Sequence, residues 1–299
     1  MALGTTGNGP ILSPEQVEGI LTVPVQKASV FLSLPGLRII DTHGPVRVPL
    51  LTGSTAPSWH GENELIDEVT QTFDEVLLLS PSIKSIKSLE RYSNELARQS
   101  ITDAIGNIQT RMVNDVAGKI DDTFFTGDGA VVSLERTQPL GVLNYSGVQE
   151  VTAVGVPTLD DLHDAEGLAL GAEVDPSRLV WVMNSRDFVN LRKLKDNGGR
   201  YQIQPDPTEA GKYQLLGHRV FVTNRLPSNL GAATNESNII LMDPSKIAVA
   251  RDLAPSLTVL PDLFGDYDQG AIRVVCRYDA AVLDPDGVVI LRGVTAPGA

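Results

Sequence analysis

The most regular pattern of apolar positions in the sequence lies between residues 100 and 126. Six apolar residues recur there at spacings of four, three, four, four and four: Ile101, Ile105, Ile108, Met112, Val116 and Ile120. These spacings place them on one face of an α-helix. Ser100 and Asp103 suit its beginning, and Gly127 and Gly129 suit its end. From residue 101 to 125 the helix would be about 37 Å long, which predicts a spine helix (about 100–126) against which a sheet lies.

Two strand-like runs precede this helix, at 38–51 and at 70–87, and Gly44-Pro45 interrupts the first. The polar, Gly-rich segment between them carries Trp59, His60, Glu62 and Glu64. Two strands joined by such a segment predict an extended hairpin. A long hairpin with a polar tip cannot bury itself, so it needs a partner surface.

Strand and helix patterns alternate in the rest of the chain. Apolar runs predict strands at 179–183, 215–222, 238–242, 247–251, 271–282 and 288–291. Helices are predicted over 159–172 and from Ser185 to Leu194, and Asp284-Pro285-Asp286-Gly287 predicts a turn before the last strand. Residues 1–12 read as a loose arm, followed by a short helix from Ser13-Pro14. The elements together predict an α+β fold.

Composition and charge narrow the function classes. Acidic residues number 37 against 24 basic ones, which gives a net charge of -13. Phosphate contacts supply most of the affinity of DNA-binding proteins, so this charge excludes a general DNA-binding module. It suits the wall of a container that must not adsorb its contents, and equally an acidic cytoplasmic protein. No apolar stretch reaches the length of a membrane span, and no secretory signal is visible, which predicts a protein made in a cytoplasm.

The side chains that carry catalysis or bind metals form no recognisable motif. The four histidines, His43, His60, His163 and His218, lack metal-ligand spacing. Cys276 lies in a strand-like run and reads as a core thiol. The pairs Asp121-Asp122 and Asp160-Asp161 read as helix-end and solvated-face charges. Nucleophile-elbow, phosphate-loop and zinc-helix motifs are absent from the sequence. The sequence therefore predicts no catalytic residue, cofactor or metal site.

The order of several short motifs resembles the HK97-fold major capsid proteins of tailed bacteriophages. The segment Ala56-Pro57-Ser58-Trp59-His60-Gly61-Glu62 is similar to the family's aromatic-then-Glu segment in its extended loop. The spine helix then ends in Phe124-Phe125-Thr126-Gly127-Asp128-Gly129, and Pro139-Leu140-Gly141-Val142 follows. Val180-Trp181-Val182-Met183-Asn184, Leu215-Leu216-Gly217 and the run from Ile272 to Val282 continue the likeness. The match covers about residues 13–292.

The resemblance implies an HK97-like architecture. Its parts would be an N-terminal arm (1–37), an extended loop (38–80), a peripheral domain with the spine helix (81–145), an axial domain (146–237), return strands of the peripheral domain (238–282) and a C-terminal segment (283–299). Trp59, His60, Glu62 and Glu64 would form an intersubunit contact at the loop tip.

The resemblance also implies a function. The chain would self-assemble into hexamers and pentamers, in the bacterial host cytoplasm, to form the icosahedral capsid of a virion around double-stranded DNA. Its other partners would be a portal protein and a decoration protein. Residues 38–80 contain no lysine, which predicts no lysine crosslink from the loop. The short arm favours a separate scaffolding protein, or none. Encapsulins, which share the fold and enclose enzymes, and soluble α+β enzymes are the alternatives.

Overall fold

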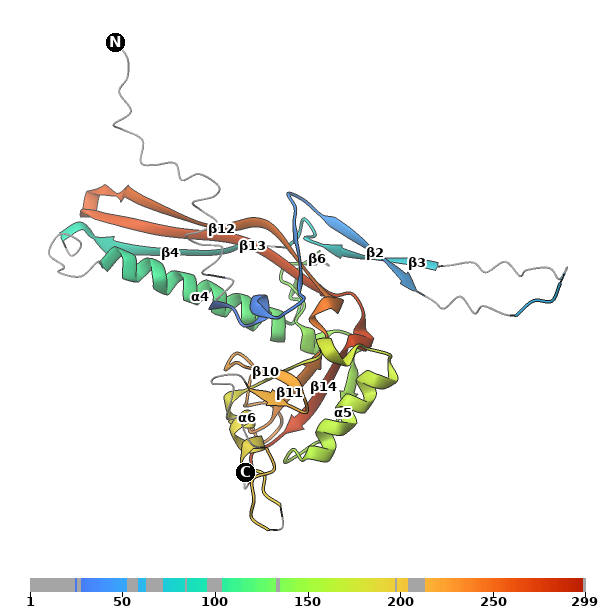
Figure 1. The fold of residues 1–299 in the computed structure, drawn as a ribbon. Coiled ribbons are helices and arrows are strands. Elements are labelled where there is room, and N and C mark those ends of the chain that lie inside the picture. The colour runs from blue at the N-terminus through green and yellow to red at the C-terminus, as the bar shows by residue number, and fades with distance from the viewer. Residues whose placement is uncertain are drawn as a thin grey trace.

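A computed structural model of the protein describes residues 25, 28–52, 59–62, 72–83, 85–95, 104–132, 135–196, 198–203 and 213–297. Within these residues the chain forms two lobes, joined where α4 ends (Figure 1). The upper lobe holds a four-stranded sheet with α4 along one face, and a two-stranded hairpin projects from it. The lower lobe holds a six-stranded sheet with α5 and α6.

The upper lobe is built on long strands. Its four-stranded sheet has the order β1-β12-β13-β4. The bounds are Arg38–Asp41 for β1, Ile86–Ser93 for β4, Ile247–Phe264 for β12 and Gln269–Val282 for β13. The hairpin pairs β2 (Val46–Thr52) with β3 (Thr72–Leu78), and β5 (Val131–Val132) pairs with β6 (Glu135–Arg136). Short 3-10 helices lie at Phe31–Ser33 (η2) and Gly265–Tyr267 (η6).

The spine helix α4 spans Ala104–Thr126. Of the predicted core residues, Met112, Val116 and Ile120 are buried, and Ile108 packs partly buried against the same cluster. Ile101 and the side chain of Ile105 lie outside the described residues. The buried side of β13, from Ile272 through Tyr278 at alternate positions, completes this core. The apolar face of the helix, which repeats every 3.6 residues, therefore packs against the apolar face of the strand, which repeats every two residues.

The lower lobe has a sheet of order β7-β14-β11-β8-β10-β9. The strands are Gln149–Val151 (β7), Val180–Met183 (β8), Gln214–Leu215 (β9), His218–Val222 (β10), Ser237–Met242 (β11) and Val288–Val294 (β14). The helices are α5 (Leu159–Gly171) and α6 (Ser185–Arg192), with 3-10 turns η3 (Val142–Asn144), η4 (Pro176–Arg178), η5 (Pro244–Lys246) and η7 (Pro285–Gly287). One face of the sheet joins the α4 core, and the other packs against α5 and α6.

Three sequence expectations are corrected. The run within 70–87 is not one strand, because β3 and β4 belong to different sheets and a turn at 79–83 separates them. The strand at 238–242 pairs with β8 and β14 in the lower lobe instead of returning to the upper one. The strand that begins at Ile247 continues to Phe264, far beyond the predicted end at 251. Apolar runs specify a strand but not the sheet that it joins, because that depends on pairing with distant segments.

Candidate assembly site

The candidate assembly elements are the hairpin, the segment before β1, and the surfaces of the two lobes. The described segment 59–62, which carries three of the predicted contact residues, lies beyond the paired strands β2 and β3, away from the core (Figure 1). Trp59 is 104% exposed, Glu62 is exposed and His60 is half-buried. Glu64 lies outside the described residues. Because an apolar side chain stabilises a fold by being buried, an indole exposed to this degree contributes no burial energy to the fold of its own chain.

The base of the hairpin is fixed to the upper lobe by two charged residues of β13. The Asp279 carboxylate is buried and accepts a hydrogen bond from the Leu79 backbone N–H at 2.8 Å. The Arg277 guanidinium donates to the carbonyls of Ser80 and Ile83 at 3.0 and 3.1 Å, and to the Asp252 carboxylate at 2.8 Å. These bonds satisfy backbone groups of the turn at 79–83 that no strand ladder reaches.

Apolar packing reinforces the same junction. Leu78 and Leu79 are buried against Ala248, Ala250 and Ala281 of the four-stranded sheet. Leu79 has a φ of 52°, a left-handed conformation that is unfavourable for a branched residue. The junction therefore holds a strained backbone position in place and sets the direction in which the hairpin leaves the lobe.

A second buried carboxylate fixes the segment before β1 to the spine helix. The Asp121 carboxylate accepts hydrogen bonds from Ser29 Oγ at 2.5 Å and from the N–H groups of Val30 and Phe31 at 2.9 and 3.1 Å. The Phe31 ring packs edge-on against Phe124 and Phe125, each at 5.1 Å between centroids. The sequence interpretation of Asp121 as a solvated charge is wrong, because the arm covers it; Asp122 does lie at the surface and pairs with Arg225.

Burial also changes the acidity of groups in this core. Desolvation raises the pKa of Asp121, and its hydrogen bonds from Ser29, Val30 and Phe31 only partly oppose that effect. Desolvation raises the pKa of the Cys276 thiol to about 12. At neutral pH the buried thiol is therefore protonated and unreactive, in agreement with its prediction as a core residue.

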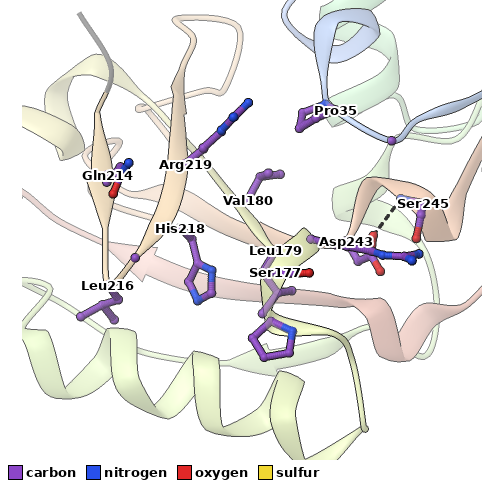
Figure 2. A pocket seen from close by; sticks show the side chains of 14 residues that line it. Pro35, Ser177, Leu179, Val180, Gln214, Leu216, His218, Arg219, Asp243 and Ser245 are labelled. Carbon is purple, nitrogen blue, oxygen red and sulfur yellow. Dashed lines mark hydrogen bonds between the residues drawn. The ribbon is translucent and has the colours of Figure 1, made fainter. Parts of the chain in front are cut away.

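A cavity of about 710 Å³ lies between the segment before β1 and the lower lobe. Figure 2 shows that it is lined by the β9–β10 turn, η4, η5 and the Pro35-Gly36 turn, with Arg219 and Val180 in the walls. Nearby, His218 lies 3.2 Å from the Glu166 carboxylate, which also faces His163 at 3.6 Å. The described residues contain no group of three or more histidine, cysteine or acidic side chains suited to hold a metal ion.

A third cluster of charged residues lies in the lower lobe, at the start of α6. Asp187, fully buried at the start of α6, accepts hydrogen bonds from Ser237 Oγ at 2.5 Å and from Arg186 Nε at 3.1 Å. Arg186 also donates to the carbonyls of Ser228, Asn235 and Val294. The cluster joins α6 to the end of β14. Sequence reasoning missed it, as it missed Arg277 and Asp279, because their partners are distant in the chain.

The position of Asp121 in the sequence does contain a signal that its carboxylate is buried. It follows Ala117 by four residues, so it lies on the apolar face of the helix next to Ile120 and Phe124. A charged residue on a buried helical face predicts a partner that covers it.

Among the helices of the described residues, none is long and apolar enough to cross a membrane.

The model of the Phage capsid family matches residues 8–293 of this sequence. The chain belongs to the phage capsid family. The major capsid protein of Klebsiella oxytoca phage phiKO2 is 24% identical over 318 residues, which cover 98% of this chain and 71% of that protein. This phage capsid protein is therefore a structural subunit of a virion shell.

Solved structures support the fold. The capsid of a native GTA particle matches with a TM-score of 0.69 and 18% identity, over 99% of this chain and 95% of that one. The structure from Microbacterium phage Oxtober96 matches with a TM-score of 0.69 and 15% identity, over 98% and 96%. Mycobacterium phage Cain gives 0.68 and 14%, over 91% of each chain. These matches confirm the HK97-like α+β fold of the phage capsid protein.

Proposed function

We propose that this capsid protein assembles with itself into hexamers and pentamers, which form the icosahedral shell around the double-stranded DNA of a tailed phage. The observation that carries the proposal is the hairpin. Its base is fixed by Asp279 and Arg277, whereas Trp59 near its end has no cover from its own chain. A rigidly directed element with an exposed indole is suited to contact a neighbouring subunit.

The proposed division of labour follows the two lobes. The upper lobe, with α4 and the four-stranded sheet, serves as the peripheral domain, and the lower lobe serves as the axial domain around capsomer axes. The hairpin is the extended loop, and the segment held by Asp121 continues the N-terminal arm. With this assignment, β11 and β14 belong to the axial domain, because they pair with β8 there.

Further partners are part of the proposal. A portal protein and a decoration protein join the particle, which is assembled in the bacterial host cytoplasm either with a separate scaffolding protein or with none. Contact with DNA is weak and nonspecific, because a net charge of -13 opposes adsorption of phosphates. The chain acts without catalysis, cofactor or membrane. An encapsulin-type shell is the alternative, and the contents of the particles distinguish the two.

Electron microscopy of the purified protein, together with its sedimentation profile, tests the proposal. Closed shells, capsomers or tubes are expected, and particles from infected cells should contain DNA. Enclosed enzymes would favour the encapsulin alternative. A protein that stays monomeric alone and with its phage's scaffolding protein would refute the assembly.

Trp59→Ala tests the role of the hairpin. The exposed indole contributes little to the fold, so its removal should change the free energy of unfolding by less than about 0.5 kcal/mol while the yield of particles falls. Trp59→Phe, which keeps an aromatic ring, is the matched control and should retain more assembly. Normal particles from Trp59→Ala would show that the tip makes no important contact.

A further inference from the structure

Helix α5 presents an acidic and apolar surface to solvent. Asp160, Asp164 and Leu168 follow one another at spacings of four, so they form one row along the helix, and all three are exposed. The helix contains no lysine or arginine. Leu168 is 39% exposed, although leucine is stabilised by burial. Asp160, Asp164 and Leu168 are called the α5 face below.

The surface around α6 has the opposite charge and is also apolar. Its exposed residues are Val189, Lys193, Lys195, Arg200, Tyr201 and Tyr213. The Lys195 ammonium lies 4.9 Å from the centre of the Tyr201 ring, and the Phe188 and Tyr213 rings pack at 4.8 Å. Among the described residues of this surface, Asp196 is an exposed acidic one, and its Oδ1 accepts hydrogen bonds from the N–H groups of Gly198 and Arg200. The six exposed residues are called the α6 face.

The two faces lie on opposite sides of the lower lobe. Both helices pack on the same side of the six-stranded sheet, where they share one apolar core. However, α5 contacts β7 and β14, at one edge of the strand order, whereas α6 follows β8 and lies toward β10. In Figure 1, α6 is accordingly on the left of the lower lobe and α5 on the right. The faces cannot meet within one chain.

We propose that the α5 face of one copy docks against the α6 face of the next copy around a capsomer axis. The charges are complementary, and each face carries at least one apolar side chain that the fold of a single chain leaves exposed. A contact between two different surfaces forms a ring when the rotation that repeats it closes on itself. The inference rests on the proposed function and adds to it which two surfaces make the ring contact.

Charge reversal tests the contact. One variant, the α5 reversal, combines Asp160→Lys with Asp164→Lys, and the other, the α6 reversal, combines Lys193→Glu with Arg200→Glu. Each variant places like charges across the proposed interface, so capsomers should be lost from the sedimentation profile at about 0.1 M salt, where charges within about 10 Å still interact. All four side chains are exposed, and circular dichroism and melting temperature show whether the fold is kept.

Restoring complementarity gives the sharper result. A chain with both reversals should form rings again, because each interface then has opposite charges. An equimolar mixture of the two single variants should also form hexamers, in which the variants alternate around the ring. It should not form pentamers, because two like variants must be neighbours in a ring of five. Native mass spectrometry and electron microscopy distinguish these products.

A matched control makes the same charge change on the upper lobe. Asp115→Lys with Asp266→Lys alters two exposed acidic residues outside both faces and should leave ring formation intact. Normal rings from both folded single reversals, or loss of rings that neither mixing nor the combined variant restores, would overturn the inference while the assembly function stands. Wild-type protein that forms no oligomer with or without scaffold would instead overturn the proposed function.

Discussion

Asp279→Asn tests how much the buried Asp279 carboxylate contributes to fixing the base of the hairpin. Asp279 is 2% exposed and accepts a hydrogen bond from the N–H of Leu79, whose backbone is left-handed. That backbone conformation costs about 1–2 kcal/mol. A hydrogen bond to a charged acceptor contributes about 1.5–3 kcal/mol, whereas one to a neutral acceptor contributes about 0.5–1.5 kcal/mol. In the Asp279→Asn variant, the hydrogen bond from the Leu79 N–H should therefore only marginally offset the strain at Leu79.

The expected loss is about 1 kcal/mol, which corresponds to about fivefold easier local opening (about 1.4 kcal/mol per factor of ten). Hydrogen exchange of peptides spanning 78–83 should accelerate by that factor. The melting temperature should fall by only about 2–4 °C, and particle yield should fall more, since the hairpin loses its fixed direction.

Asp268→Asn is the control for this measurement. Asp268 is exposed at the far end of the same sheet, also has a positive φ of 49°, and its carboxylate accepts a hydrogen bond from Asn94. The substitution there should leave exchange at 78–83 unchanged. If Asp279→Asn protein exchanged at the wild-type rate in that segment, the carboxylate would not hold the hairpin base, and the reasoning would be wrong.

Three further outcomes are expected. Ala117→Pro should prevent folding, because it removes a mid-helix hydrogen bond and inserts a ring into a position that is 1% exposed; a helical, particle-forming variant would contradict this. Because the pKa of Asp121 is raised in the folded protein, the folded protein binds a proton there more readily than the unfolded chain, and this proton binding stabilises the fold. The stabilisation is fully present below the ordinary pKa of 3.8 and is lost as the pH rises through the pKa of the folded state. The melting temperature of wild type minus that of Asp121→Asn should therefore increase from pH 7 toward pH 4, and a constant difference would count against the shift. Cys276, with its pKa raised to about 12, should resist a thiol reagent at pH 8 in the native protein and react after denaturation; fast native labelling would show that the strand opens.

Local elements were predictable where a single periodic signal was strong. The apolar stripe of the spine helix identified α4 and its buried residues Met112, Val116 and Ile120, since a 3.6-residue period needs only neighbouring positions. The exposed tip at Trp59 followed from a polar segment between two strands. Asp121 was misjudged because the segment that covers it lies about ninety residues away, at Ser29–Phe31.

The sequence by itself determined the elements that depend on neighbouring residues: the spine helix, the break at Gly44-Pro45, the buried strands, and the absence of familiar catalytic motifs. The tertiary structure alone decided which sheet each strand joins, that Asp279 and Arg277 hold the hairpin base, and that α5 and α6 lie toward opposite edges of one sheet. The physical reason is that helical and strand periods follow from local backbone geometry, whereas strand partners and buried ion contacts depend on residues up to two hundred positions apart.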